Sequence, residues 1–396
     1  MTGITKNKKI FYVFISLIVI ICVLIGALFY TIKKYTELEM QNAFLSIENE
    51  MLKNPIDDTA TTPEDNTQLP HSDVHDIEGL SAYQKLAQGQ PINILIVGDS
   101  IATYPWDIQV QAYLQEKYGS AVTIDNKALT GSSSYAGYVA VKKLLQNENI
   151  AEATTYDLAI ICYGQNDDDI GFSTNYEALI HTILSNYEGC NIVCIQEASQ
   201  MDYTDKMLAI ANIADYYQLQ LADTIASSSM ASGGNIALLT EDNVHPNEQG
   251  TAIYAQTVET TIDEAVINNI GKKSMPSPID TAVYDLAEFK EITADQFHRA
   301  DKDYYLELDQ PISAVLGYDL ITVLGDNGFR IIVDGTTEYS IQEDGFLSSP
   351  VINLVGHAEN GSYEKIQAQK SILITFNTNP QADKFNGIYL SNSIIN

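Results

Sequence analysis

Short apolar runs alternate with amphipathic segments of helical length between about residues 83 and 271. Strands that are apolar on both faces and separated by helices are typical of a parallel sheet covered on each side. The pattern therefore predicts a three-layer α/β domain, whose reactive groups should gather at the carboxyl ends of the strands. The expected strands are Ile92–Val97, Val122–Leu129, Leu158–Tyr163, Ile192–Gln196 and Leu219–Asp223. The expected helices are Trp106–Tyr118, Tyr135–Gln146, Asn175–Tyr187, Met207–Tyr217 and Glu248–Ile267.

After a boundary at residues 272–278, the pattern changes to short strands without intervening helices. Turn sequences such as Asp334-Gly335 and Asp344-Gly345 separate these strands. Residues 275–396 are therefore expected to form an all-β accessory domain, a sandwich or jelly roll, without a cluster of candidate catalytic residues. The expected strands are Tyr304–Leu308, Ser313–Leu324, Phe329–Val333, Thr337–Ile341, Val351–Val355, Ser371–Phe376 and Gly387–Leu390.

The amino-terminal part of the chain contains an uncharged, apolar stretch from Ile10 to Ile32. As a helix it would be about 34 Å long, which is enough to cross the hydrocarbon core of a bilayer. The alternatives are a buried helix or a cleaved signal peptide. The stretch is apolar on every face, exceeds the roughly 7–15 residues of a signal h-region and lacks a small-residue cleavage site. We therefore expect a single-pass transmembrane anchor at residues 10–32.

The distribution of charge sets the expected location and partners. Lysines at positions 6, 8 and 9 favour a cytoplasmic location for residues 1–9. The part of the chain that follows the anchor is then expected to be extracellular. Residues 33–82 are expected to form a stalk helix and a flexible acidic linker. The formal net charge of −31 argues against a nucleic-acid partner and suits solubility outside a cell.

The sequence predicts no metal site and no cofactor. His71 and His75 have a spacing that could hold a metal on a helix, but Pro70 and the polar surroundings disfavour a helix there. The acidic run at 167–169 lacks the ligand spacing of an EF-hand and is interpreted as solvated. The cysteines beyond the anchor lie in or beside apolar runs and are interpreted as buried small hydrophobic residues.

A serine stands where the first expected strand ends, in Gly98-Asp99-Ser100. Gly98 allows a tight turn, so the Ser100 hydroxyl should emerge beside backbone N–H groups that stabilise an anion. The G-x-S-x-G elbow of the α/β-hydrolases is absent, because position 102 is Ala. As a bare tripeptide this motif is more often a turn, and only its position after a strand makes it a candidate nucleophile.

Two candidate oxyanion donors follow the next strands of the sheet. Gly131 follows the second apolar run and could present a backbone N–H to a developing oxyanion, although a lone glycine is usually a turn residue. Asn166 lies in Gly164-Gln165-Asn166-Asp167, directly after the third strand. Its side-chain amide could donate to the same oxyanion, or could merely cap the next helix.

Asp242 and His245 stand three residues apart, with Pro246 behind them, just before the last expected helix of the α/β unit. A turn at that spacing lets the carboxylate reach one ring nitrogen of the imidazole. This contact fixes the tautomer, so that the other nitrogen can take a proton from a serine. Most isolated histidines have no catalytic role, but His245 is the only one of the six that sits beside a carboxylate at such a junction.

In order and spacing, these four blocks resemble those of the SGNH hydrolases, also called GDSL-type esterases and lipases, over about residues 92–267. The resemblance implies a flavodoxin-like five-stranded sheet. It implies Ser100 as nucleophile, His245 as base and Asp242 as the residue that orients the base. It also implies an oxyanion hole built from the N–H groups of Ser100 and Gly131 and from the Asn166 amide.

The leading functional hypothesis is a membrane-anchored extracellular serine esterase that removes O-acetyl groups from cell-surface carbohydrate through an acyl-Ser100 intermediate. One alternative is an O-acetyltransferase that uses the same residues, and another is a non-catalytic polysaccharide-binding protein. The chain encodes no multi-span acyl-donor transporter, which favours hydrolysis. Four aromatic residues near the site either stack on sugar rings or belong to the core: Tyr104, Trp106, Tyr135 and Tyr138.

Overall fold

The computed structural model describes residues 72–391, apart from 148–154, 200–203, 344–347 and 360. The expected anchor at 10–32, the stalk that follows it and most of the acidic linker lie outside the described residues. Among the helices in the described ranges, none combines the length and the apolar character needed to span a bilayer.

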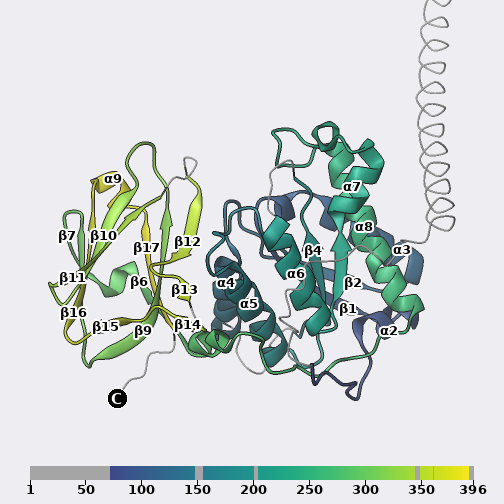
Figure 1. Cartoon of the computed structure of the whole chain (residues 1–396), viewed down its shortest axis with the longest axis horizontal. Coiled ribbons are helices and arrows are strands. Elements are labelled where there is room, and N and C mark those ends of the chain that lie inside the picture. The colour runs from purple at the N-terminus through teal and green to yellow at the C-terminus, as the bar shows by residue number, and fades with distance from the viewer. Residues whose placement is uncertain (1–71, 148–154, 200–203, 344–347, 360, 392–396) are drawn as a thin grey trace, which may run out of the picture. The chain divides into compact units, whose positions relative to one another are not determined.

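A five-stranded parallel sheet forms the centre of the α/β domain (Figure 1), with the strand order β2-β1-β3-β4-β5. This order is that of flavodoxin-like folds, so the predicted parallel α/β sheet is confirmed. The second strand is shorter than expected, because it ends at Asn126 and the chain then turns, although the N–H of Leu129 still bonds the Gly98 carbonyl. The strands are β1 (Ile92–Gly98), β2 (Val122–Asn126), β3 (Leu158–Cys162), β4 (Asn191–Gln196) and β5 (Gln220–Asp223).

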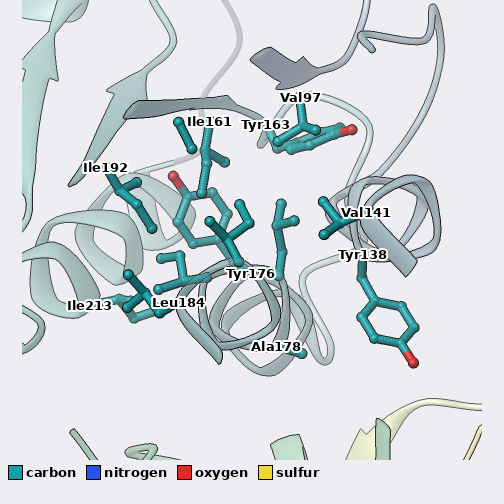
Figure 2. Close-up of a cluster of buried hydrophobic side chains, with 14 of the residues drawn as sticks. Val97, Tyr138, Val141, Ile161, Tyr163, Tyr176, Ala178, Leu184, Ile192 and Ile213 are labelled. Carbon is teal, nitrogen blue, oxygen red and sulfur yellow. The ribbon is translucent and has the colours of Figure 1, made fainter. Parts of the chain in front are cut away.

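Helices cover both faces of this sheet, and alternate residues of β1 show why. Ile94 and Ile96 enter one core with α3 and α8, whereas Leu95 and Val97 enter a second core with α4 and α5. Figure 2 shows side chains of the second core. Full burial of each such side chain contributes about 1.5–3 kcal/mol to stability. The helices are α2 (Ala82–Ala87), α3 (Trp106–Tyr118), α4 (Ser134–Asn147), α5 (Phe172–Asn186), α6 (Thr204–Tyr216), α7 (Thr224–Ser232) and α8 (Glu248–Ile267).

Helix α7 was not predicted from the sequence. Its residues are mostly small and polar, with serines in the middle, so they give no apolar periodicity. The helix forms because Asp223 caps it by accepting from the N–H of Ala226, and it ends at Gly233, whose φ is 63°.

The carboxyl-terminal unit is an antiparallel sandwich, as predicted in coarse form. One sheet has the order β11-β10-β16-β8-β7, and the other has the order β12-β9-β17-β6, with β15 paired to β9. Strand β6 was not predicted, because adjacent charges at Lys290 and Glu291 conceal its apolar positions. The main strands are β6 (Phe289–Thr293), β7 (His298–Ala300), β8 (Asp303–Glu307), β9 (Ile312–Ile321), β10 (Gly328–Val333), β11 (Thr337–Gln342), β12 (Pro350–Leu354), β15 (Ile366–Ala368), β16 (Ser371–Phe376) and β17 (Phe385–Ser391).

The sandwich packs on helix α4 of the α/β domain through two tyrosines. The Tyr138 hydroxyl donates to the Leu286 carbonyl at 2.7 Å. Tyr135 fills the space above Gly317 in β9, where an added Cβ would lie 2.3 Å from the Tyr135 hydroxyl. Tyr389 of β17 belongs to the same core as both tyrosines. The two domains therefore share one continuous apolar core at this contact.

Candidate active site

Strand β1 delivers Ser100 to the carboxyl edge of the sheet. Gly98 is required at the end of the strand, because a Cβ there would lie 2.3 Å from Ala102 Cβ and 2.8 Å from the Cys162 carbonyl. Asp99 then accepts the N–H of Ile101 at 2.9 Å, which tightens the turn. Ser100 precedes a short 3₁₀ helix and is only 7% exposed.

A second tight turn carries the histidine. Asp242 Oδ1 accepts the N–H groups of Val244 at 3.2 Å and of His245 at 2.8 Å. Asn243 adopts a φ of 77° inside this turn, a conformation that asparagine tolerates better than most residues. Asn247 then caps α8 by accepting the N–H of Gly250 at 3.0 Å. The turn therefore holds Asp242 and His245 side by side at the start of a long helix.

The structure brings the three residues expected to carry the chemistry into one chain of hydrogen bonds. His245 Nδ1 lies 2.7 Å from Asp242 Oδ2, and His245 Nε2 lies 2.8 Å from Ser100 Oγ. With Nδ1 protonated and donating to the carboxylate, Nε2 is the acceptor for the serine proton. This is the geometry of an activated serine nucleophile.

The carboxylate of this triad stays ionised over a wide pH range. The backbone N–H and the ring of His245 donate to Asp242 and lower its pKa to about 2. The Asp242 side chain is nevertheless 56% exposed, whereas that of His245 is 25% exposed. Water therefore screens part of the attraction between the carboxylate and an imidazolium.

Because Asp242 is partly exposed, we expect its replacement to lower activity less than replacement of a buried triad aspartate. In Asp242→Asn a single side-chain oxygen remains, and it cannot accept both from the backbone N–H groups and from the ring of His245. We therefore expect the imidazole to lose its fixed orientation. Because solvent already screens the charge, kcat should fall about 10²-fold, less than the roughly 10⁴-fold seen when a buried triad aspartate is replaced. Hydrolysis of p-nitrophenyl acetate at pH 7.5 measures this loss. Glu241→Gln is the matched control and should stay close to the wild type.

The loops that carry the expected oxyanion donors, Gly131 and Asn166, contact each other and the residue before Ser100. Asn166 Nδ2 lies 3.1 Å from Asp99 Oδ2 and 3.3 Å from the Ser132 carbonyl. Ser132 in turn follows Gly131, which forms a turn with a φ of 75°. The loop after β2 is therefore held against the end of β1 and against Asn166. The bond that Asn166 directs to the Ser132 carbonyl is the longer of its two bonds.

The structure decides between the two interpretations of the aromatic residues and corrects the interpretation of one aspartate. Of the four aromatic residues, Trp106, Tyr135 and Tyr138 are fully buried core residues. Tyr104 alone remains accessible, and its ring stacks on His245 with centroids 5.9 Å apart. Asp167 is not solvated, because it is buried and accepts both the N–H and the hydroxyl of Ser134. Its burial raises the pKa of Asp167 to about 6.

Two buried carboxyl groups beneath the site were missed by the sequence reasoning. Asp99 and Glu197 are both fully buried, and burial together with the charge of Glu197 raises the pKa of Asp99 well above its ordinary value. Glu197 follows β4 directly, so its place after a strand, on the edge that carries Ser100, was the available signal. Within the described ranges, no group of three or more His, Cys, Asp or Glu side chains is arranged to hold a metal.

A small hollow adjoins Asn166 and is lined by both domains. The α/β domain contributes Asp168 and Asn175, and the sandwich contributes Asn353 and His357. These side chains offer hydrogen-bond donors and acceptors. The sandwich therefore contributes polar groups close to the candidate oxyanion hole.

No protein-family model and no curated protein matches the sequence. Among solved structures, a two-domain esterase (CEX) active on acetylated mannans matches with a TM-score of 0.60 and 17% identity, over 78% of this chain and 93% of that chain. Its structure co-crystallised with mannopentaose gives 0.58 and 18%, with the same coverage. An acetylxylan esterase, Axe2 from Geobacillus stearothermophilus, matches 44% of this chain and 96% of its own length, with 20% identity and a TM-score of 0.36. The two matches with TM-scores of 0.60 and 0.58 therefore show that the chain has the fold of a two-domain esterase.

Proposed function

We propose that this protein is a serine esterase that removes acetyl groups from carbohydrate. The observation that carries this proposal is the unbroken hydrogen-bond chain from Asp242 through His245 to Ser100 Oγ. A serine that lies 2.8 Å from an oriented imidazole, beside an amide donor and backbone N–H groups, is equipped for acyl transfer.

The chemistry follows from the positions of these groups. Ser100 Oγ attacks the ester carbonyl while His245 Nε2 takes the hydroxyl proton. The resulting oxyanion accepts from the N–H groups of Ser100 and Gly131 and from the Asn166 amide, and each such donor is worth about 3–4 kcal/mol in the transition state. His245 then gives its proton to the departing sugar hydroxyl and leaves acetyl-Ser100. Water, deprotonated by the same imidazole, releases acetate and restores the serine.

Carbohydrate is the substrate class that the surroundings favour. The hollow beside Asn166 is lined by the polar side chains of Asn353, His357 and Asp168, which suit sugar hydroxyl groups. The accessible ring of Tyr104 lies beside the imidazole and offers an apolar face. The structurally similar two-domain esterase is active on acetylated mannans, which supports the same bond type here.

The enzyme is proposed to act outside the cell, held at the membrane by residues 10–32. That segment lies outside the described residues, and the support for an anchor is its uncharged sequence. Acetylated cell-surface polysaccharide is then the substrate within reach.

The purified full chain can be tested with acetylated mannan and acetylated xylan. We expect acetate release from at least one polymer, and labelling of Ser100 by a fluorophosphonate probe, located by peptide mass spectrometry. Absence of both label and hydrolysis, including hydrolysis of p-nitrophenyl acetate, would favour the polysaccharide-binding alternative. Transfer of acetyl to an added sugar hydroxyl, without free acetate, would identify a transferase.

Replacing polar groups of the hollow should separate polymer binding from chemistry. We expect the double substitution Asn353→Ala and His357→Ala to raise KM for an acetylated polymer about tenfold, because two hydrogen-bonding groups are lost. Hydrolysis of p-nitrophenyl acetate should stay within twofold, since that substrate is too small to reach the sandwich. His298→Ala, an exposed histidine on β7, is the control. Equal KM values for the polymer in both variants would contradict a role for the hollow.

A further inference from the structure

Two acidic side chains lie directly under the candidate nucleophile and oxyanion hole. Asp99 immediately precedes Ser100, and Glu197 follows β4, yet neither is exposed to solvent. Burial raises the pKa of Asp99, and the two carboxyl groups lie close enough for the charge of Glu197 to raise it further, so a proton on the pair relieves an unfavourable interaction. Two buried carboxylates without a proton would repel each other strongly.

Each member of this pair holds a different segment of the site. Asp99 accepts the N–H of Ile101 at 2.9 Å and the Asn166 amide at 3.1 Å. Glu197 accepts the N–H of Gln165 at 3.2 Å and the thiol of Cys162 at 3.1 Å. The pair therefore joins the serine turn after β1 to the loop that carries Asn166.

We propose that Asp99 and Glu197 are positioning residues that share a proton, and that Asp99 orients the Asn166 amide for the oxyanion hole. This inference rests on the proposed esterase function. An amide nitrogen has two hydrogens, and Asp99 fixes one of them. The other hydrogen, now directed to the Ser132 carbonyl, is thereby left on the side where the oxyanion forms.

The surroundings favour a pair that keeps its proton. Burial raises the pKa of Asp99 well above its ordinary value, and it raises the pKa of Glu197 to about 7. The other titratable groups that face the pair are Cys162, Tyr163, Asp167 and Tyr176. Lys206, which bonds the Asp167 carbonyl, is the nearby cation among the described residues.

The two amide variants should behave differently. In Glu197→Gln, the oxygen can stay on the Gln165 N–H, while the new amide nitrogen donates to Asp99 in place of the shared proton. Asp99 keeps both of its acceptor contacts, so kcat for p-nitrophenyl acetate should stay within about fivefold of the wild type. In Asp99→Asn, the remaining side-chain oxygen still accepts the N–H of Ile101. The new amide nitrogen then faces the amide nitrogen of Asn166, and since both are donors, the bond that orients Asn166 is lost. We expect kcat to fall about 10²-fold, with KM within threefold.

The pH dependence gives a second test, independent of activity. A carboxyl whose pKa is raised in the folded state binds a proton that the unfolded chain releases, so stability falls as pH rises from about 4.5 to about 7. Glu197→Gln removes this penalty. Its melting temperature relative to the wild type should therefore rise by about 3 °C between pH 5 and pH 8.

The control is Glu177→Gln, which changes another buried carboxyl group, on α5 and bonded to Tyr217. It should alter stability without lowering kcat. Equal kcat values for Asp99→Asn and Glu197→Gln, in an active wild type, would overturn the positioning role, and a pH-independent difference in melting temperature would overturn the shared proton. An inactive wild type would reject the esterase function instead, while the melting experiment would still report on the pair.

Discussion

Replacing Ser100 by alanine is expected to lower kcat/KM for p-nitrophenyl acetate by about 10⁴-fold or more. The substitution removes the hydroxyl oxygen that is placed to form the acyl intermediate, while the oxyanion donors and the ester-binding surface remain. KM should change little, because the lost group acts in the chemical step. Initial rates with freshly prepared enzyme, corrected for spontaneous hydrolysis, measure the effect.

Ser120→Ala is the matched control for that substitution. Ser120 is also buried, but it precedes β2 on the opposite edge of the sheet. It should retain wild-type rates, and both variants should keep the same melting temperature within a few degrees. A Ser100→Ala enzyme that hydrolyses the ester at the wild-type rate would show that the activity arises elsewhere.

Replacing His245 by alanine should have nearly the same effect, and combining it with Ser100→Ala should add almost nothing. A serine without its base is a poor nucleophile, and a base without the serine has no proton to take, so the two residues act as a unit. The 2.8 Å distance between Nε2 and Oγ is the structural reason for this coupling. Rates of the two single variants and of the double variant provide the test.

His298→Ala serves again as the control for loss of a histidine. If the double variant were slower than either single variant by the product of their two effects, Ser100 and His245 would act independently. That result would contradict a shared proton transfer. Fluorophosphonate labelling adds a second measurement, because His245→Ala should slow labelling of Ser100 even where turnover is too slow to follow.

The strands of the α/β domain could be predicted because they are buried on both faces. A run of adjacent apolar residues such as Ile92–Val97 is typical of a strand that is buried on both faces of a parallel sheet. The candidate triad could also be predicted from local features of the sequence. Ser100 follows a strand end directly, and Asp242 and His245 share one turn, so local spacing and the order of elements carry the information.

Other features depend on contacts between distant segments and leave no periodic signal. The role of Glu197 becomes visible only when β4 is paired with β3, because this pairing brings the Glu197 carboxyl group close to Asp99. The burial of Tyr135 and Tyr138 depends on the sandwich, which begins more than a hundred residues later. The same applies to the hollow beside Asn166, because residues of two domains line it.

The close approach of Tyr135 to Gly317 limits how this protein can be divided. A catalytic fragment cut before residue 275 would leave Tyr135 and Tyr138 facing water, and such an apolar surface promotes self-association. A larger side chain at position 317 would collide with Tyr135 and displace helix α4, which begins just after the loop that carries Gly131. The sandwich is thus a structural half of the enzyme, and swapping it for an unrelated sugar-binding module would require a new partner for these two rings.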